Sequence, residues 1–376
     1  MPLHTKATAR ELRRSRRGPY DRRVRTEVLR VDPQKGPWPG LERAAQLVDD
    51  GGLVAFPTET VYGIAVNLRD EAAVRRLYQA KGREEDKPLT VHLAVREALL
   101  PLVKDPPRAA VKLAARLWPG PLTIVISDRH GRPTGYRVPD LAVAQEFLRL
   151  ASCRVGATSA NPSGGADAVT ADEVLRHFDG VIDLVVDGGR CRHARASTVV
   201  RADDEGVSVL REGVVPAAEI REVTAKSLLF VCTGNRCRSP MAAVFATDLL
   251  ARRAGVDPAD LVDAGFRVSS AGTGCMRGSP ATQEAVDAAR RYGCDLTAHR
   301  SRPLTPSLLE DADEIYVMTP EHRASILEFA ADADDRVRLL DRGSKAIPDP
   351  YGQGPAAYEK SAARIHRAIE ERLDDF

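Results

Sequence analysis

The chain has 376 residues, a formal net charge of +2 and a hydrophobic fraction of 43%, which together predict two globular domains with buried cores. No apolar run of about 18 residues occurs, which excludes a membrane-spanning helix, and the first residues lack the apolar stretch of a secretory leader. Six cysteines are too few for a disulfide framework, so we expect a reducing, cytoplasmic location.

The first 30 residues are strongly basic, with nine arginines and Lys6 against Glu11, Asp21 and Glu27. A segment of this composition is usually a flexible, solvated tail, and this is our prediction for residues 1–30. The alternative is a basic arm that contacts RNA.

Residues 31–215 alternate apolar runs with polar loops. Runs rich in β-branched residues predict strands at 53–56 and 89–95, and a third at the start of 153–165. Asp70 and Gly82 are suited to begin and end a helix. A hairpin that turns at 203–206 is predicted within 197–212, and residues 216–226, with no clear strand or long helix, are predicted to be a linker.

Residues 227–376 begin with the apolar run SLLFV and then alternate apolar and charged stretches, as a parallel α/β unit does. Ser239 suits the N-cap of the helix that follows this run, and Pro240 its first position. At the end of the chain, apolar residues at helical spacing predict a helix that docks on the sheet: Tyr358, Ala362, Ile365, Ile369 and Leu373.

The ten residues VCTGNRCRSP (231–240) predict a site that cleaves phosphate esters. In this stretch, Cys232 is followed after five residues by Arg238. A loop from strand into helix directs backbone N–H groups inward, where they bind phosphate, and Arg238 adds two parallel hydrogen bonds. Ionised Cys232 would attack phosphorus. Asp349, restricted by the proline after it, would protonate the leaving oxygen and later activate water.

The remaining residues of this loop are expected to surround the phosphate, with Asn235 and Ser239 holding the loop and the thiolate in place. The predicted phosphate loop comprises Thr233, Gly234, Asn235, Arg236, Cys237 and Ser239.

With four downstream motifs, the stretch resembles the low molecular weight protein tyrosine phosphatases over residues 227–376. These motifs are SSAGT (269–273), AHRSRPLT (298–305), DADEIYVMT (311–319) and DPY (349–351). The resemblance implies a doubly wound parallel sheet with catalysis at the carboxyl end of its first strand. It also implies no cofactor, a phosphorylated protein or small phosphoester as substrate, and a reversible disulfide between Cys237 and Cys232 that protects the nucleophile.

Arg236 departs from the family pattern. Tyrosine phosphatases have a small aliphatic residue at this position, and protein-arginine phosphatases have threonine. The substrate therefore stays open between phosphotyrosine, phosphoarginine and a small phosphoester. Arsenate reductases, which share this fold, relay electrons through further cysteines. Because Cys275 and Cys294 do not form such a pair in the sequence, a reductase is the weaker alternative.

A second set of motifs lies in the first half of the chain. Lys81, Arg83 and Lys87 form a basic group suited to a triphosphate, and Ser159 and Asn161 offer short polar groups beside a glycine turn. No Walker-type loop is present, so a nucleotide site here would be of another kind. The motifs are PTETVYG (57–63), KGREEDKPLTVH (81–92), WPGPLT (118–123), YRVP (136–139), TSANPSGG (158–165), ST (197–198) and REG (211–213).

In this order the motifs resemble the YrdC-like threonylcarbamoyl-AMP synthases, over about residues 35–215. The resemblance implies a twisted open α/β sheet that converts L-threonine, bicarbonate and ATP, with Mg²⁺ on the phosphates, into threonylcarbamoyl-AMP and pyrophosphate. This product feeds the machinery that makes N6-threonylcarbamoyladenosine in tRNA. By motif, threonine would contact Thr60, His92, Arg137 and Ser197, and ATP would contact Lys81, Arg83, Lys87, Ser159, Asn161 and Arg211.

We therefore expect a bifunctional α/β fusion, in which a synthase domain at residues 31–215 precedes a phosphatase domain at 227–376. The alternative is that the first half is a module that binds RNA, including double-stranded RNA, and so localises the phosphatase.

Overall fold

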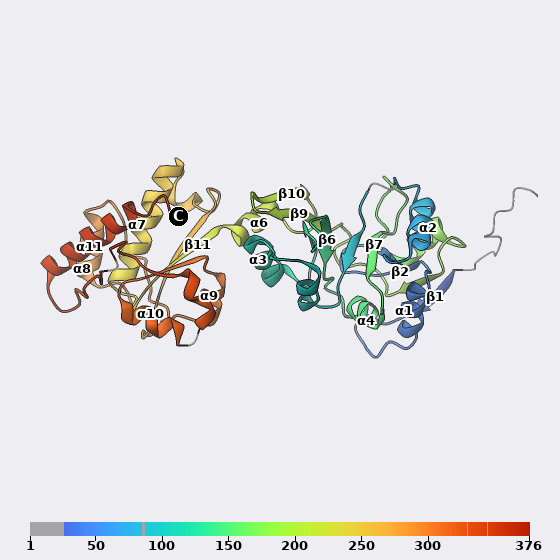
Figure 1. The fold of residues 1–376 in the computed structure, drawn as a ribbon, viewed down its shortest axis with the longest axis horizontal. Helices are drawn as coiled ribbons and strands as arrows, with labels where there is room; N and C mark the ends of the chain where they lie inside the picture. The colour runs from blue at the N-terminus through green and yellow to red at the C-terminus, as the bar shows by residue number, and fades with distance from the viewer. Residues whose placement is uncertain (1–25, 85–86, 329, 344) are drawn as a thin grey trace, which may run out of the picture. The chain divides into compact units, whose positions relative to one another are not determined.

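The computed structural model describes residues 26–84, 87–328, 330–343 and 345–376. The chain divides into two compact units between Pro216 and Ala217 (Figure 1). Most of the predicted basic tail, and with it the proposed RNA contact, lies outside the described residues. Its end differs from the prediction: Glu27–Arg30 forms strand β1, because its backbone pairs in parallel with β8 (Leu184–Asp187).

The first unit is built on a mixed ten-stranded sheet with the order β1-β8-β2-β3-β7-β4-β6-β5-β9-β10. Strands β4 and β6 are parallel neighbours, and β7 runs antiparallel to β4. The remaining strands of this sheet are β2 (Val54–Phe56), β3 (Gly63–Asn67), β4 (Thr90–His92), β5 (Leu122–Ser127), β6 (Pro133–Arg137), β7 (Val155–Ser159), β9 (Thr198–Asp203) and β10 (Gly206–Arg211).

Helices cover both faces of this sheet, because successive residues of a strand point to opposite sides. Ala55 of β2 packs in a core with α2 and α5, whereas Val54 and Phe56 pack with α1 and α4. The helices of the unit are α1 (Leu41–Asp49), α2 (Glu71–Lys81), the 3₁₀ helix η1 (Arg96–Leu102), α3 (Arg108–Leu117), α4 (Ala142–Leu150) and α5 (Ala171–Phe178).

The local predictions for this unit are largely confirmed. The Asp70 carboxylate accepts hydrogen bonds from the first N–H groups of α2, and Gly82 ends that helix at a φ of 58°, where a side chain would be strained. Strands β9 and β10 pair as the predicted hairpin. The strand predicted over 89–95 is shorter, Thr90–His92, because Val95 already leads into η1.

The second unit contains a parallel sheet with the order β12-β11-β13-β14. Its first strand lies between the second and third, as in doubly wound folds, whose ligands bind where the strand order reverses. The strands are β11 (Lys226–Cys232), β12 (Phe266–Gly272), β13 (Glu314–Val317) and β14 (Val337–Leu339).

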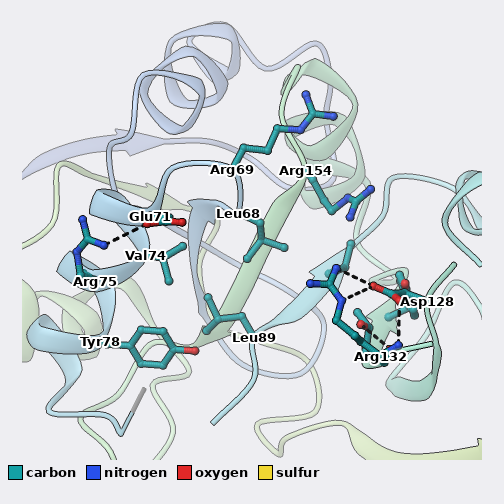
Figure 2. Close-up of a pocket in the computed structure, with 13 residues that line it drawn as sticks. Leu68, Arg69, Glu71, Val74, Arg75, Tyr78, Leu89, Asp128, Arg132 and Arg154 are labelled. Carbon is teal, nitrogen blue, oxygen red and sulfur yellow. Dashed lines mark hydrogen bonds and ion pairs between the residues drawn. The ribbon is translucent and has the colours of Figure 1, made fainter. Parts of the chain in front are cut away.

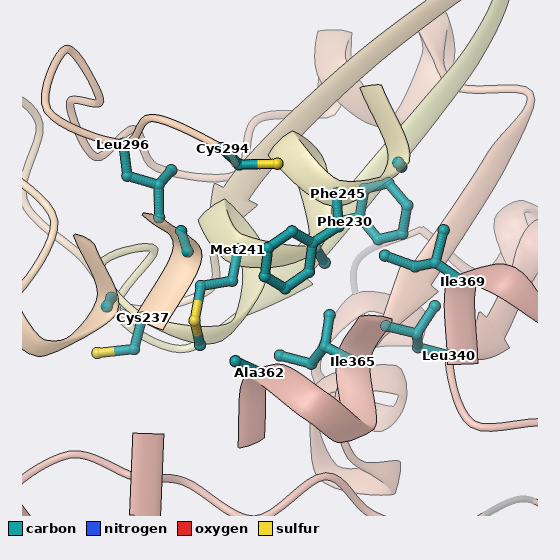
Figure 3. Packing of buried hydrophobic residues seen from close by; sticks show 14 of the residues in the cluster. Phe230, Cys237, Met241, Phe245, Cys294, Leu296, Leu340, Ala362, Ile365 and Ile369 are labelled. Carbon is teal, nitrogen blue, oxygen red and sulfur yellow. The ribbon is translucent and has the colours of Figure 1, made fainter. Parts of the chain in front are cut away.

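Helices cover both faces of this sheet as well, and successive side chains of β11 point to alternate faces. Leu228 and Phe230 face a core with α7, α8 and α11, and Leu229 and Val231 face α9 and α10. Figure 3 shows the first core, with Phe230 among side chains of α7 and α11. The helices are α6 (Ala217–Thr224), α7 (Arg238–Ala254), η2 (Pro258–Asp260), α8 (Gln283–Arg290), α9 (Pro306–Asp311), α10 (Pro320–Leu327), η3 (Ala331–Arg336) and α11 (Pro355–Glu370).

The segment predicted to be a linker, residues 216–226, contains the short helix α6, in which Ile220 is buried. One prediction for this unit was wrong. Ser239 is not the N-cap of α7: that position belongs to Cys237, and the helix begins at Arg238, because the Ser239 hydroxyl is engaged inside the loop. The predicted docking of α11 is confirmed by its buried apolar face. Among the described residues, none of the helices combines the length and apolar character that a membrane crossing requires.

Candidate active sites

The loop between β11 and α7 brings Cys232 and Ser239 together. The Sγ atom of Cys232 lies 3.0 Å from Ser239 Oγ, and the Nδ2 group of Asn235 donates to the same hydroxyl at 3.0 Å. The hydroxyl proton of Ser239 has two acceptors within reach, Cys232 Sγ and, at 3.3 Å, the Ala271 carbonyl oxygen. Turned toward the sulfur, the hydroxyl would stabilise a thiolate nucleophile. Ser239 is therefore placed to support a nucleophilic Cys232 from within the loop.

Asn235 adopts a left-handed conformation, with a φ of 49°, which is costly for a residue other than glycine. Several contacts hold it there. Its Oδ1 atom accepts from Arg302 N at 2.9 Å, its Nδ2 group donates to Ser270 Oγ at 2.9 Å, and its carbonyl oxygen accepts from His299 Nε2 at 2.8 Å. The SSAGT and AHRSRPLT motifs thus supply the partners that fix the shape of the phosphate loop.

The guanidinium of Arg238 is buried in the same site, with 3% of the residue exposed. Its Nη1 group donates to the Ile347 carbonyl at 3.1 Å, and its Nη2 group donates to Asp349 Oδ2 at 2.5 Å. Its Nε group has no partner among the described residues. The structure therefore brings the predicted nucleophile loop, arginine and carboxylate into one site, with an N–H group of the arginine unused.

A histidine that sequence reasoning missed also contacts the loop. His322 Nε2 lies 2.9 Å from Thr233 Oγ1, and His322 Nδ1 lies 3.0 Å from Thr319 Oγ1. Burial and the charge of Arg238 lower the pKa of His322 to about 4, so the ring is neutral at pH 7. The DADEIYVMT motif ends at Thr319, one turn before this residue, and gave no sign of it.

Two other cysteines of this unit, Cys237 and Cys294, make contacts of their own away from the Cys232 sulfur. Cys237 Sγ lies 3.3 Å from Tyr358 OH and 3.7 Å from Thr282 Oγ1, and burial raises the pKa of its thiol. Cys294 packs in the core between α7 and α8 (Figure 3). The predicted Cys232–Cys237 disulfide stays a prediction, and forming it requires Cys237 to leave these contacts.

Arg236 lies at the surface beside the loop, where its Nε group donates to the Pro280 carbonyl at 2.9 Å. Two large apolar side chains in segments that contact the site are unusually exposed, Met276 at 82% and Tyr351 at 64%. The segment before Met276 reaches the loop through a hydrogen bond from Gly274 N to the Thr233 carbonyl, and Tyr351 N donates to Asp349 Oδ1. The surroundings of the loop thus combine a cation with apolar surface.

In the first unit, a pocket of about 160 Å³ lies over strands β4, β6 and β7. The strands are neighbours in the sheet, so side chains on one face of each converge there although they are far apart in sequence. The predicted residues that line it are Arg83, His92, Arg137, Ser159, Ser197 and Arg211.

One lining residue, Arg137, forms a buried ion pair behind the pocket with Glu59, a residue that sequence reasoning left out. Arg137 Nη2 donates to Glu59 Oε1 at 2.7 Å and to Thr60 Oγ1 at 2.7 Å. Only 1% of Glu59 and 5% of Arg137 are exposed, and Glu59 Oε2 and Arg137 Nε lack partners among the described residues. Glu59 lies inside the PTET motif, and this position was the one sequence feature that could have marked it as a site residue.

Burial also affects two other charged or titratable groups of the pocket, His92 and Arg211. Burial and the charge of Arg137 lower the pKa of His92 to about 3, so its imidazole is neutral. Burial also lowers the pKa of Arg211, whose Nη2 group donates to the Ser197 carbonyl at 2.9 Å. The hydroxyls of Ser197 and Thr123 lie 3.0 Å apart. Thr123, at the end of the WPGPLT motif, is a further lining residue that was not predicted.

Other predicted ATP contacts sit outside the pocket lining. Only 3% of Lys81 is exposed, and burial lowers the pKa of its ammonium group to about 8. This ammonium group donates hydrogen bonds to the carbonyls of Ser159 and Asn161. Lys87 is exposed and pairs with Glu84 at 2.8 Å. Lys81 therefore shapes the Ser159 loop from behind, and the ATP contacts of Lys81, Lys87 and Asn161 stay predictions.

The lining of the pocket contains no carboxylate, and nowhere in the described parts of the chain do three or more His, Cys, Asp or Glu side chains gather as metal ligands. The residues present thus do not form a magnesium site of their own. Magnesium prefers a few protein oxygens together with phosphates of a nucleotide, so any ion here would enter with a nucleotide.

Comparison with known proteins finds two families. The Sua5/YciO/YrdC family, described as telomere recombination, matches residues 46–213, and the low molecular weight phosphotyrosine protein phosphatase family matches residues 227–375. The chain is 41% identical over 207 residues to a threonylcarbamoyl-AMP synthase of Pyrococcus abyssi. It is also 34% identical over 146 residues to EpsP of Ralstonia solanacearum, described as a low molecular weight protein-tyrosine-phosphatase.

The matches cover different shares of these relatives. The synthase alignment takes in 53% of this chain and 61% of the Pyrococcus protein, so the chain spans less than two thirds of that relative. The EpsP alignment takes in 39% of this chain and 92% of EpsP, and a relative from Methanocaldococcus jannaschii, 32% identical, is covered over 88% of its length. A solved structure of a P. abyssi Sua5 variant matches with a TM-score of 0.50 and 26% identity, covering 84% of this chain and 98% of that one.

Proposed function

The chain belongs to the Sua5/YciO/YrdC family through its first unit and to the low molecular weight phosphatase family through its second, and on this basis we propose that it is a bifunctional enzyme. The first activity is synthesis of threonylcarbamoyl-AMP from L-threonine, bicarbonate and ATP, for the modification of tRNA. The second is hydrolysis of phosphate esters through a phosphocysteine. One observation in each unit supports the proposal: the convergence of basic and hydroxyl groups on one pocket, and the Cys232 loop that faces Arg238 and Asp349.

In the first unit, Arg83 and Arg211 would bind the phosphates of ATP, because both residues line the pocket and guanidinium groups recognise phosphate oxygens. Arg137, with an unused Nε group, would hold the carboxylate of threonine. The amine of threonine combines with bicarbonate to give a carbamate and water. The carbamate oxygen then attacks the α-phosphorus of ATP, and pyrophosphate leaves. Catalysis in this pocket is mainly positioning and neutralisation of charge.

In the second unit, the phosphate of the substrate would displace the Asp349 carboxylate from Arg238 and use the free guanidinium N–H groups. Cys232 Sγ attacks phosphorus, and the bond to the leaving oxygen breaks as protonated Asp349 gives that oxygen its proton. The resulting carboxylate then takes a proton from water, which attacks the phosphocysteine and releases phosphate and the thiolate.

We propose phosphotyrosine as the protein substrate of this site. The exposed side chains of Met276 and Tyr351 offer apolar surface for an aromatic ring, which pairs well with such side chains. The cation of Arg236 beside the loop disfavours the positively charged guanidinium of phosphoarginine.

Two assays on the full chain test the proposal, with each variant serving as the control for the other. Arg83→Ala should abolish pyrophosphate release that depends on threonine and bicarbonate, and should leave hydrolysis of p-nitrophenyl phosphate unchanged. Cys232→Ser should do the reverse. The proposal fails for a unit whose activity is missing in the reduced wild-type protein. Salt-sensitive RNA binding without ATP turnover would favour the RNA-binding alternative, and arsenite production from arsenate with a thiol reductant would favour the reductase.

A further inference from the structure

A second hollow in the first unit lies on the other face of the strands that carry the synthase pocket. Successive residues of β4 and β6 line the synthase pocket and this second hollow in turn. His92 and Arg137 line the synthase pocket, whereas their neighbours Val91 and Tyr136 line a groove of about 570 Å³. Because successive side chains of a strand point to opposite faces, the groove is separate from the synthase pocket. Figure 2 shows its lining residues.

The floor of the groove is apolar. It is formed by aliphatic side chains and two tyrosine rings: Leu68, Val74, Leu89, Val91, Tyr78 and Tyr136. Gly156 of β7 makes room for one of them, because a Cβ atom at this position would lie 2.4 Å from Leu68 Cδ2. The hydroxyl of Tyr78 donates to the Lys87 carbonyl at 2.7 Å. The floor therefore offers apolar surface, and the hydroxyl of one of its two tyrosines already has a partner.

The rim of the groove carries more positive than negative charge. Arg75 pairs with Glu71 at 3.4 Å, and Arg132 pairs with Asp128 at 2.9 Å. Two further arginines, Arg69 and Arg154, are exposed, and the structure gives their side chains no hydrogen bond or ion pair with any described residue. Figure 2 shows the side chains of Arg69 and Arg154 on the same side of the groove, and the hydrogen bond from Leu68 N to the Arg154 carbonyl at 3.0 Å places their segments side by side.

We propose that this groove binds a small organic phosphate, with its ring on the apolar floor and its phosphate between Arg69 and Arg154. The volume lies within the usual range for small-molecule sites, roughly 300–1,000 Å³. Guanidinium groups recognise phosphate oxygens through paired hydrogen bonds. A nucleoside monophosphate has the required ring and charge.

The test is calorimetric titration of AMP into the full chain carrying Arg83→Ala and Cys232→Ser, which remove nucleotide binding in the synthase pocket and hydrolysis in the second unit. In this background, Arg69→Gln/Arg154→Gln is compared with the matched pair Arg43→Gln/Arg201→Gln, two exposed arginines of the same unit. AMP should bind the background and the matched pair equally, and the groove variant at least tenfold more weakly. Adenosine and inorganic phosphate should each bind the background at least tenfold more weakly than AMP.

Other outcomes overturn the proposal. The first is that AMP does not bind the background protein, and the second is that AMP binds the groove variant and the matched variant equally well. The third is that inorganic phosphate binds as tightly as AMP, because the ligand would then be held by surface charge alone, without contact to the apolar floor. Tighter binding of a single-stranded RNA octamer than of AMP, lost in the groove variant, would assign the groove to nucleic acid instead. Because Arg69 and Arg154 are exposed and unpaired, their replacement should leave the thermal unfolding of the chain unchanged, which serves as the folding control.

Discussion

Arg238 and Asp349 form an ion pair across the phosphate loop, with Nη2 donating to Oδ2 at 2.5 Å. The arginine is buried and half of the aspartate side chain is exposed. The pair holds the carboxylate of the proposed general acid beside the guanidinium that the substrate phosphate would bind. Phosphate and Asp349 therefore compete for the same guanidinium, and substrate binding should release the carboxylate toward the leaving group.

Asp349→Asn should lower kcat/KM about 10²–10⁴-fold for phenyl phosphate, whose leaving group needs a proton. For p-nitrophenyl phosphate the loss should be smaller, since this leaving group departs as the anion. Steady-state kinetics with both esters measure the difference, and kcat/KM is compared because it covers only the steps up to the phosphocysteine. Equal losses of kcat/KM for the two esters would mean that Asp349 does not act as the acid.

Arg236 should set the preference among phosphopeptides. Its cation lies beside the loop, anchored by the Pro280 carbonyl, so it should attract acidic residues next to phosphotyrosine. Arg236→Ile should raise KM about three- to tenfold for an acidic phosphotyrosine peptide, since an exposed ion pair contributes about 0.2–1 kcal/mol and several can act together. The KM for p-nitrophenyl phosphate should stay unchanged. An increased kcat/KM for phosphoarginine in Arg236→Thr would support the same role.

The cysteines should differ sharply in labelling with iodoacetamide. Burial raises the pKa of Cys153 and Cys191 to about 12 and that of Cys294 to about 11. Because the thiolate is the reactive form and a raised pKa leaves the thiol protonated at pH 7, these residues should stay unlabelled in the native protein and react faster only as the pH rises. Peptide mass spectrometry should show labelling of Cys232 that inorganic phosphate blocks. Fast labelling of Cys237 at pH 7 would contradict its buried contacts with Tyr358 and Thr282.

Lys81 and Arg83 are two residues apart, and we expect different consequences when they are replaced. Lys81→Met removes the donor to two carbonyls of the Ser159 loop, and leaving buried carbonyls unpaired costs about 1–3 kcal/mol each. The variant should lower the thermal unfolding temperature of the first unit and also impair ATP use. Arg83→Ala should abolish ATP use with no change in unfolding temperature. Calorimetry and pyrophosphate release separate the two, and a stable but inactive Lys81→Met protein would make Lys81 a ligand contact.

Glu59 should matter for the synthase although it was not predicted as a site residue. Glu59→Gln keeps the shape of the side chain but leaves the buried Arg137 without its counter-charge, and breaking a buried ion pair costs about 3–5 kcal/mol. We expect a large loss of stability in the first unit and weaker threonine binding. Glu59→Asp should restore part of both. Unchanged threonine affinity in Glu59→Gln would show that Arg137 keeps its place without this partner.

Much of the fold could be read along the chain, because its cues are local. Asp70 and Gly82 bound α2 through contacts with adjacent residues and through glycine's tolerance of positive φ. The spacing of apolar residues predicted α11, and the motifs predicted both families. Prediction was poorer where two local preferences competed. Ser239 has the residue type of an N-cap, but a contact with Cys232 engages its hydroxyl.

By itself, the sequence determined which residue types are available for each reaction and the order of the elements that carry them. The tertiary structure alone decided which of those residues face a site. Lys81 and Arg83 belong to one motif, yet one points behind the Ser159 loop and the other lines the pocket. Val91 and His92 are neighbours that face opposite hollows. The physical reason is that pairing between strands from distant segments decides on which face of the sheet each side chain lies. Burial then requires each polar group to find a hydrogen-bond partner among the residues that the fold brings near it.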